Sequence, residues 1–192
     1  MMDEKTKKEQ ELKFYKETEL KLKASSVSGV INTIKELHKT GNPSILPLIF
    51  DLLDATQDDL VAKEILILLG ELKDNKTVHQ VAEYISKYSS GKYFAKVIAT
   101  CWQSGLDFSS EITLFVKCFI EGDYEVALES FTVIEEMIWR TPIDKINICK
   151  ATLTGRAQEI STEKKPLYLE LLKILNEGVT MNRDEFPDLY LQ

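Results

Sequence analysis

The stretch NPSILPLIFDLL, residues 42–53, decides the fold, because it has the pattern of one complete amphipathic helix with a marked start. Asn42 can cap a helix through its side-chain oxygen. Pro43 suits the first helical turn, where its missing N–H would have had no partner. The apolar side chains that follow recur at helical spacing and share one face: Ile45, Leu48, Ile49 and Leu52.

Similar segments follow at a nearly constant interval, so this helix is one copy of a repeat. The position of Ile45 recurs at Val78, Ile112 and Ile146, in steps of 33, 34 and 34 residues. Two more apolar positions keep the same steps: Leu48, Val81, Phe115 and Cys149, and then Leu52, Ile85, Phe119 and Leu153. Another apolar helix precedes each copy, so the unit is a helical hairpin that must stack on its neighbours to bury both of its apolar faces.

The predicted fold class is all-α, an α–α superhelix of about four helical hairpins plus a C-terminal capping helix. The hairpins begin at Ser26, Asp58, Phe94 and Asp123, and the last helix runs from about Thr162 to Asn176. Alternating strand patterns and Asn-Gly turns between β-branched runs are missing. We divide the chain into a charged leader or cap helix at 1–24, a repeat domain at 25–177 and a tail at 178–192.

The repeat resembles the HEAT-repeat and armadillo group of α–α solenoids. The resemblance rests on LHKTGNPSILPLIFDLL at 37–53 and LLGELKDNKTVHQVAEYI at 68–85, with more degenerate units at 93–119 and 124–153. The period is nearer to that of tetratricopeptide units, at about 34 residues, than to that of HEAT units, at about 40 or more. The tetratricopeptide pattern of Trp, Leu-Gly and Tyr is not in register here, so we favour the HEAT-like interpretation. A HEAT-like architecture by itself indicates almost nothing about function.

Composition excludes several function classes. The 192 residues include 31 acidic and 24 basic side chains, and the formal net charge is −7. Nucleic acid requires a dense cationic footprint, so we expect no nucleic-acid partner. No signal-peptide pattern and no run of about 18 apolar residues occurs, so we expect no membrane contact. Cys101, Cys118 and Cys149 are widely spaced, which predicts reduced thiols in a cytoplasmic protein, with no metal and no cofactor.

Two surfaces are candidate binding sites. In solenoids of the family that the chain resembles, the second helices usually line the concave surface. On these helices, the row opposite the buried one holds Asp51, Tyr84, Cys118 and Thr152, and the adjacent row holds Asp54, Lys87, Glu121 and Gly155. We predict a partner-binding groove at Asp51, Asp54, Tyr84, Lys87 and Glu121, with a solvated helix face as the alternative.

The tail is the second candidate surface, since it puts apolar residues into an acidic terminus. Phe186, Leu189 and Tyr190 either dock on another protein or cover the last helix. HEAT-like alkylpurine glycosylases use Trp, Asp and Arg in a basic cleft, and Trp102 with Trp139-Arg140 is the one similar feature. We interpret both tryptophans as core residues whose indole N–H bonds to a carbonyl.

The leading functional hypothesis is a non-catalytic protein–protein interaction scaffold that presents a curved helical-repeat surface to an unknown protein partner. One alternative is an acidic inhibitor or immunity-type protein that binds a basic partner. A less favoured alternative is a HEAT-like DNA glycosylase or lyase. The sequence contains no GxSxG, Walker or GxGxxG motif, so we expect no enzyme and name no catalytic residue.

Overall fold

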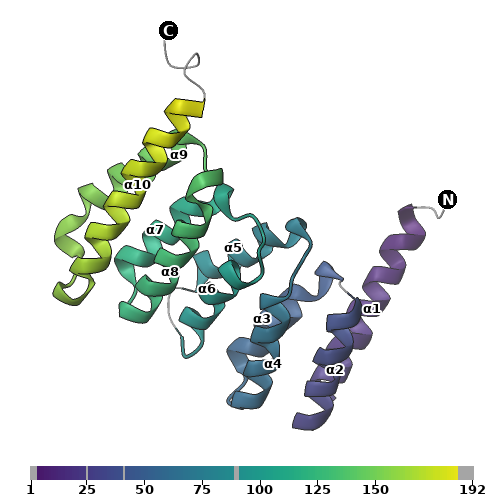
Figure 1. Cartoon of the computed structure of the whole chain (residues 1–192). Helices are drawn as coiled ribbons and strands as arrows, with labels where there is room; N and C mark the ends of the chain where they lie inside the picture. The colour runs from purple at the N-terminus through teal and green to yellow at the C-terminus, as the bar shows by residue number, and fades with distance from the viewer. Residues whose placement is uncertain (1–3, 25, 41, 89–90, 186–192) are drawn as a thin grey trace.

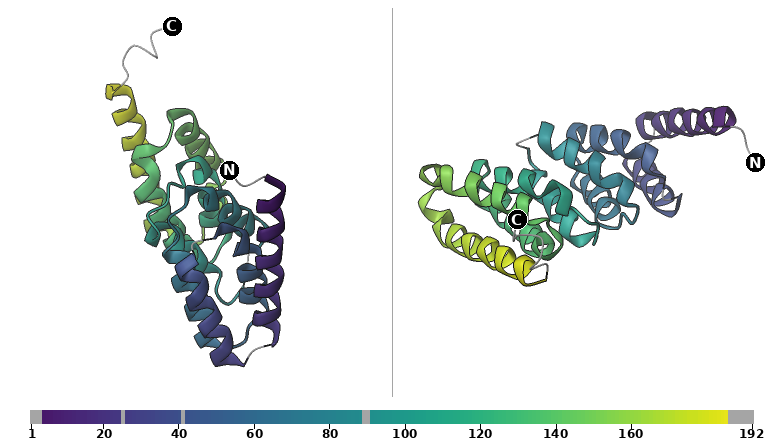
Figure 2. Two further views of the ribbon diagram at one scale, coloured as in Figure 1. Left: turned by 90° about the vertical axis from the view of Figure 1, so that its right-hand side faces the viewer. Right: turned by 90° about the horizontal axis from the view of Figure 1, so that it is seen from above.

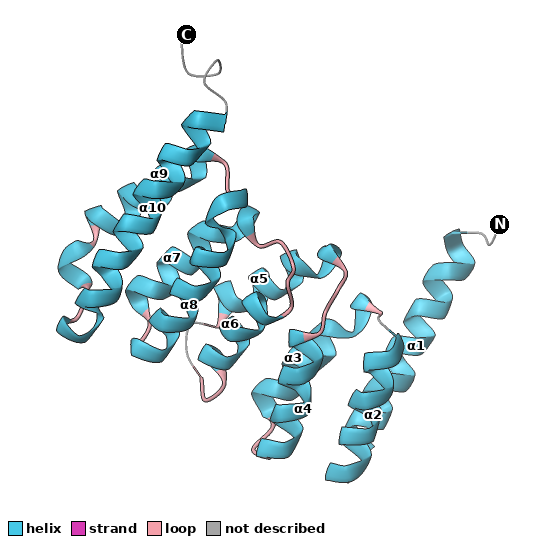
Figure 3. Ribbon diagram, in the orientation of Figure 1, coloured by secondary structure: helices cyan, strands magenta, loops and turns pink. Residues whose placement is uncertain are grey.

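The computed structural model describes residues 4–24, 26–40, 42–88 and 91–185, and this part of the chain is helical without any strand (Figure 3). Its α-helices are α1 Glu4–Ala24, α2 Val27–Thr40, α3 Leu46–Ala55, α4 Asp59–Gly70, α5 Val78–Lys87, α6 Phe94–Gln103, α7 Ile112–Glu121, α8 Tyr124–Met137, α9 Ile143–Gly155 and α10 Lys165–Glu185. Short 3-10 helices join them: η1 Pro43–Ile45, η2 Asn75–Thr77, η3 Ser109–Glu111, η4 Ile138–Arg140, η5 Ala157–Glu159 and η6 Thr162–Lys164.

The helices pack in the order of the chain. Along one layer, α2, α4, α6 and α8 lie side by side in succession, and in the other layer α3 contacts α5 and α7 contacts α9. Helix α1 packs on α2 and η1, while α10 packs on α8 and α9 (Figure 1). Helices α1 and α10 therefore lie at opposite ends of the array, as a second view also shows (Figure 2). The expected helix pairs correspond in sequence to α2 and α3, α4 and α5, α6 and α7, and α8 and α9, whereas the main contacts between consecutive helices of this region join α3 to α4, α5 to α6 and α7 to α8.

Asparagine and aspartate side chains set the starts of three expected elements. Asn42 Oδ1 accepts a hydrogen bond from Ser44 N at 3.0 Å, although the first turn is the 3-10 helix η1 and α3 begins only at Leu46. Asp58 accepts from two amides of α4, and Asp123 caps α8. The predicted starts are confirmed, because a short carboxylate or amide satisfies N–H groups that have no partner within the helix.

The three repeated apolar positions form the core between hairpins. Eleven of the twelve side chains are buried, and the twelfth, Leu52, is partly buried against the core. Those of α7 are fully buried: Ile112, Phe115 and Phe119. Burial of one such side chain contributes about 2 kcal/mol, so the rows stabilise the junctions between hairpins more than any surface contact can.

The N-terminal segment forms the helix α1 from Glu4 to Ala24, in agreement with the cap-helix alternative predicted for this part of the chain. Its packed side chains are Phe14, Thr18 and Leu22, spaced by four residues, together with Tyr15. Leu12 and Leu20, the other large apolar side chains of this helix, are exposed. Side chains that are four residues apart share one helical face. In α1 this face packs on α2 and η1.

The C-terminal helix extends beyond its expected end. We expected it to stop near Asn176, but α10 continues to Glu185, so the segment assigned as a tail begins within the helix. Gly178 packs so closely on Ile138 that an added Cβ would lie 2.7 Å from its Cγ1 atom. Phe186, Leu189 and Tyr190 lie outside the described residues.

A buried lysine of η6 joins this end of the chain to the end of α7. Lys164 is 4% exposed, and its ammonium group donates hydrogen bonds to three main-chain oxygens at the end of α7: Phe119 O at 3.1 Å, Ile120 O at 2.8 Å and Gly122 O at 2.8 Å. Carbonyls at a helix C-terminus have no partner within the helix, and they carry the negative end of the helix dipole. Lys164 therefore caps the C-terminal end of α7 with a donor from another part of the chain.

Replacing Lys164 by methionine should destabilise the fold, because the three carbonyl oxygens lose their shared donor. We expect the free energy of unfolding to fall by about 3 kcal/mol, measured by urea denaturation. Lys165→Met, at the exposed next position, is the matched control and should change it by less than about 0.5 kcal/mol. Equal unfolding midpoints for the two variants would contradict the assigned role.

Candidate functional site

Four of the predicted groove residues lie on one exposed face formed by α3, α5 and α7. Asp54, Lys87 and Glu121 are all exposed, and so is Asp51, one turn earlier on α3. The predicted row of Asp54, Lys87, Glu121 and Gly155 faces solvent at every position. We call the exposed surface of these three helices the α3–α5–α7 face.

The other predicted row is not solvent-facing throughout. Tyr84 is 8% exposed and Cys118 is 9% exposed, so the expectation of exposure was wrong for both residues. The ring of Tyr84 stacks on Phe50 with centroids 4.2 Å apart and an angle of 8° between the planes. A large ring placed between two helices is covered by both of them, whereas Asp51 at the equivalent position of the preceding hairpin has no such cover.

A hydrogen bond between hairpins fixes Tyr84. Its hydroxyl group donates to Asp54 Oδ1 at 2.6 Å, which joins α5 to α3. Burial raises the pKa of Tyr84, and the carboxylate of Asp54 raises it further. The phenol is therefore neutral at physiological pH and acts as a fixed donor.

The aromatic stack continues to the surface at Tyr88. The rings of Tyr84 and Tyr88 lie 4.7 Å apart, and Tyr88 is 42% exposed. Sequence reasoning missed Phe50 and Tyr88 as site residues. Two tyrosines four residues apart share a helical face, and this signal could have identified the pair.

Two clefts flank α3 on this face. The α3–α5 cleft has a volume of about 260 Å³ and is lined by Pro47, Phe50, Asp51, Gln80, Glu83, Tyr84, Lys87 and Tyr88. The α1–α3 cleft has a volume of about 270 Å³ and is lined by Glu19, Leu22, Lys23, Leu48, Asp51, Leu52 and Ala55. Each cleft combines an apolar floor with a charged rim, which is the usual composition of a binding site.

Most charges along the face are paired within the molecule. Lys87 Nζ lies 2.7 Å from Glu83 Oε1, and this hydrogen bond lowers the pKa of Glu83. Glu121 accepts from Arg156 at 2.8 Å, and the same guanidinium group binds Glu159 at 2.6 Å. Exposed pairs such as these contribute little stability, but they fix side chains that a partner would meet.

A larger cavity than these two clefts lies elsewhere, between the ends of α2 and α4. It has a volume of about 520 Å³, an apolar floor and a rim that includes His38, Glu71, Lys73 and Asp74. The imidazole of His38 lies next to the carboxylate of Glu71, Lys73 donates to Ser104 O at 2.9 Å and Asp74 caps η2. These polar groups hold turns together, so size alone does not make this cavity the best candidate.

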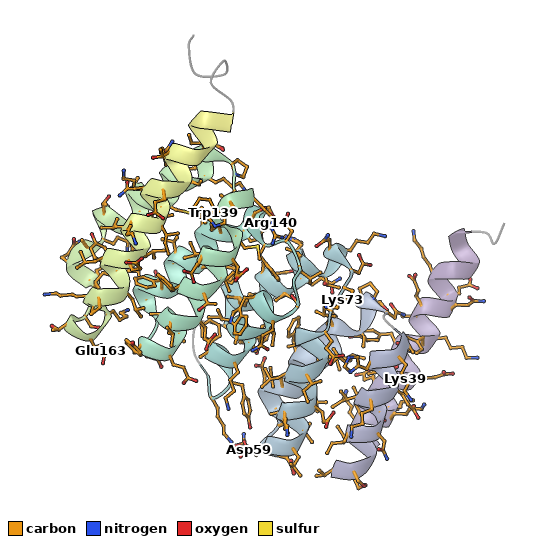
Figure 4. The ribbon with its side chains drawn as sticks, in the orientation of Figure 1. Lys39, Asp59, Lys73, Trp139, Arg140 and Glu163 are labelled. Carbon is orange, nitrogen blue, oxygen red and sulfur yellow. The ribbon has the colours of Figure 1, made fainter. Side chains whose placement is uncertain are left out.

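The tryptophans are not core residues, and the core interpretation was wrong for both. Trp102 is 37% exposed and donates to the carboxylate of Glu129 at 2.9 Å rather than to a carbonyl. Trp139 is 51% exposed, and Figure 4 shows it close to Arg140 in η4, the 3-10 helix that packs on α10. Neither tryptophan lines any of the three clefts described above.

Burial makes the three cysteine thiols poorly reactive. All three cysteines are buried and unpaired, and burial raises the pKa of Cys118 to about 12 and that of Cys149 to about 11. Thiols with such values stay protonated at neutral pH and are poor nucleophiles. Within residues 4–185, apart from the gaps stated above, no group of three or more His, Cys, Asp or Glu side chains could hold a metal ion.

Tyr84→Phe should separate the hydrogen bond from the stack. The variant keeps the ring on Phe50 but removes the donor to Asp54, so we expect the free energy of unfolding to fall by about 1.5 kcal/mol in urea denaturation. Tyr88→Phe is the control and should leave stability within about 0.5 kcal/mol of the wild-type value. A loss that is no larger for Tyr84→Phe than for Tyr88→Phe would show that the link between hairpins contributes nothing.

Comparison of the chain with protein-family models, with curated proteins and with solved structures finds no match. Among the described helices, none combines the length and apolar character that crossing a membrane requires.

Proposed function

We propose that this chain is a HEAT-like solenoid that acts as a non-catalytic scaffold for protein–protein interaction through the α3–α5–α7 face. The architecture is inferred from the repeat spacing and from helices that each contact their neighbours along the chain. The observation that carries the functional proposal is the aromatic stack of Phe50, Tyr84 and Tyr88, which runs from the core to the surface inside the α3–α5 cleft.

Polar contacts between residues about one repeat apart support the solenoid. Tyr84 bonds to Asp54 across 30 positions, Tyr93 to Asp59 across 34, and Arg156 to Glu121 across 35. In a solenoid each unit contacts mainly the next, so its contacts recur at the repeat length. The same spacing appears in the buried rows and in these surface bonds, which are chemically independent.

The geometry of Tyr88 supports protein binding. Interface energy is concentrated in a few anchors, and tyrosine is among the most frequent, because it offers a large rigid surface with a polar end. The ring of Tyr88 stacks on the ring of Tyr84, which is held between α3 and α5. Tyr88 therefore loses little conformational entropy when a partner covers it. The paired charges of Glu83 and Lys87 beside it supply a polar rim.

Capture from cell extract with matched variants tests the proposal. The full chain, Tyr88→Ala and Tyr124→Ala serve as baits, and bound proteins are quantified by mass spectrometry. Tyr124 is the matched control because it is 43% exposed, against 42% for Tyr88, but lies on α8. We expect at least one protein retained by the wild type and Tyr124→Ala to be depleted about tenfold on Tyr88→Ala.

Equal recovery of every captured protein on the two variants would contradict a binding role for this face. Thermal unfolding of both variants is measured in parallel, so that a loss of binding is not confused with a loss of folded protein.

A further inference from the structure

Asp51 lies between the two clefts on the α3–α5–α7 face. It is the residue shared by the linings of the α1–α3 and α3–α5 clefts, so its exposed carboxylate lies on the ridge between them. Any segment that crosses from one cleft to the other must pass this carboxylate. The chemistry of Asp51 therefore decides what kind of segment fits.

The other ionised groups of the two clefts are satisfied locally. Lys23 Nζ lies 2.6 Å from Glu19 Oε1 in the α1–α3 cleft, and the pair of Lys87 with Glu83 lies in the α3–α5 cleft. Within the described part of the chain, Asp51 has no hydrogen-bond or ion-pair partner, and Lys23 is the cation that senses its charge. Three carboxylates against two ammonium groups leave one excess negative charge in the clefts, at Asp51.

The lining on each side of Asp51 sets the rest of the ligand. On the α1 side the floor is aliphatic, with Leu22 and Leu48 buried beneath it. On the α5 side the exposed ring of Tyr88 lies beside Gln80, whose side-chain oxygen is buried without a donor among the described residues. A partly exposed amide at this position can pair with a main-chain N–H or C=O group of a ligand.

We propose that this double cleft binds a protein segment that carries a lysine or arginine next to an aliphatic residue. The cation pairs with Asp51 on the ridge, the aliphatic side chain enters the α1–α3 cleft, and the continuing chain covers Tyr88. The inference rests on the proposed function and adds the chemical class of the partner. It agrees in sign with the formal net charge of −7, which favours basic partners at long range.

Phage display of random peptides on the immobilised full chain tests this inference. We expect enriched peptides to share a basic residue adjacent to an aliphatic one. Synthetic versions of these peptides should bind Asp51→Asn about tenfold more weakly than the wild type, because a charge-assisted hydrogen bond is lost. Asp144→Asn, an exposed aspartate on α9, is the matched control and should bind like the wild type. Binding should also weaken with added salt.

The outcomes separate the two proposals. Peptides without a basic residue, or peptides that lose affinity on Tyr88→Ala but not on Asp51→Asn, would overturn the cation site and leave the binding face intact. Peptides that bind both variants like the wild type would overturn the binding face itself. Failure to enrich any peptide would count against the double cleft as a peptide site.

Discussion

The structure depends on the burial of apolar rows that no single hairpin can cover. In α7 the side chains of Ile112, Phe115 and Phe119 are fully enclosed, although the helix has only ten residues and little intrinsic stability of its own. The helices that contact α7 most are α8 and α9, which both follow it in the chain. Removing α8 and α9 would therefore expose the apolar row of α7, so the stability of α7 depends on these two helices.

The same constraint creates the candidate site. The clefts lie between α1 and α3 and between α3 and α5, so they exist only where consecutive units are stacked. The bond from Tyr84 to Asp54 joins two units, and it also holds the stack that presents Tyr88. Lys164 has a comparable role at the far end, where it ties α10 to the end of α7. The fold and the proposed binding surface thus share their stabilising contacts.

Much of the fold could be predicted from the sequence, because periodicity reports burial directly. The all-helical class, the burial of the repeated apolar positions, the cap at Asn42 and the helix starts at Asp58 and Asp123 are confirmed. The site was predicted less well. Helical position gives the direction of a side chain but not what covers it, so Tyr84 was expected at the surface and Trp102 in the core. The burial of Lys164 depends on carbonyls more than 40 positions away, which no local pattern encodes.

Hydrogen exchange of the full chain, alone and bound to a partner recovered with the wild type, tests whether the partner binds at the α3–α5–α7 face. Amides of residues 46–55 and 78–88 should exchange more slowly in the complex, because the partner covers the clefts beside α3 and α5 and suppresses local opening there. Exchange over residues 143–155, in α9, should not change. Slower exchange confined to α8, α9 and α10, with residues 46–88 unaffected, would contradict the assignment of the binding face.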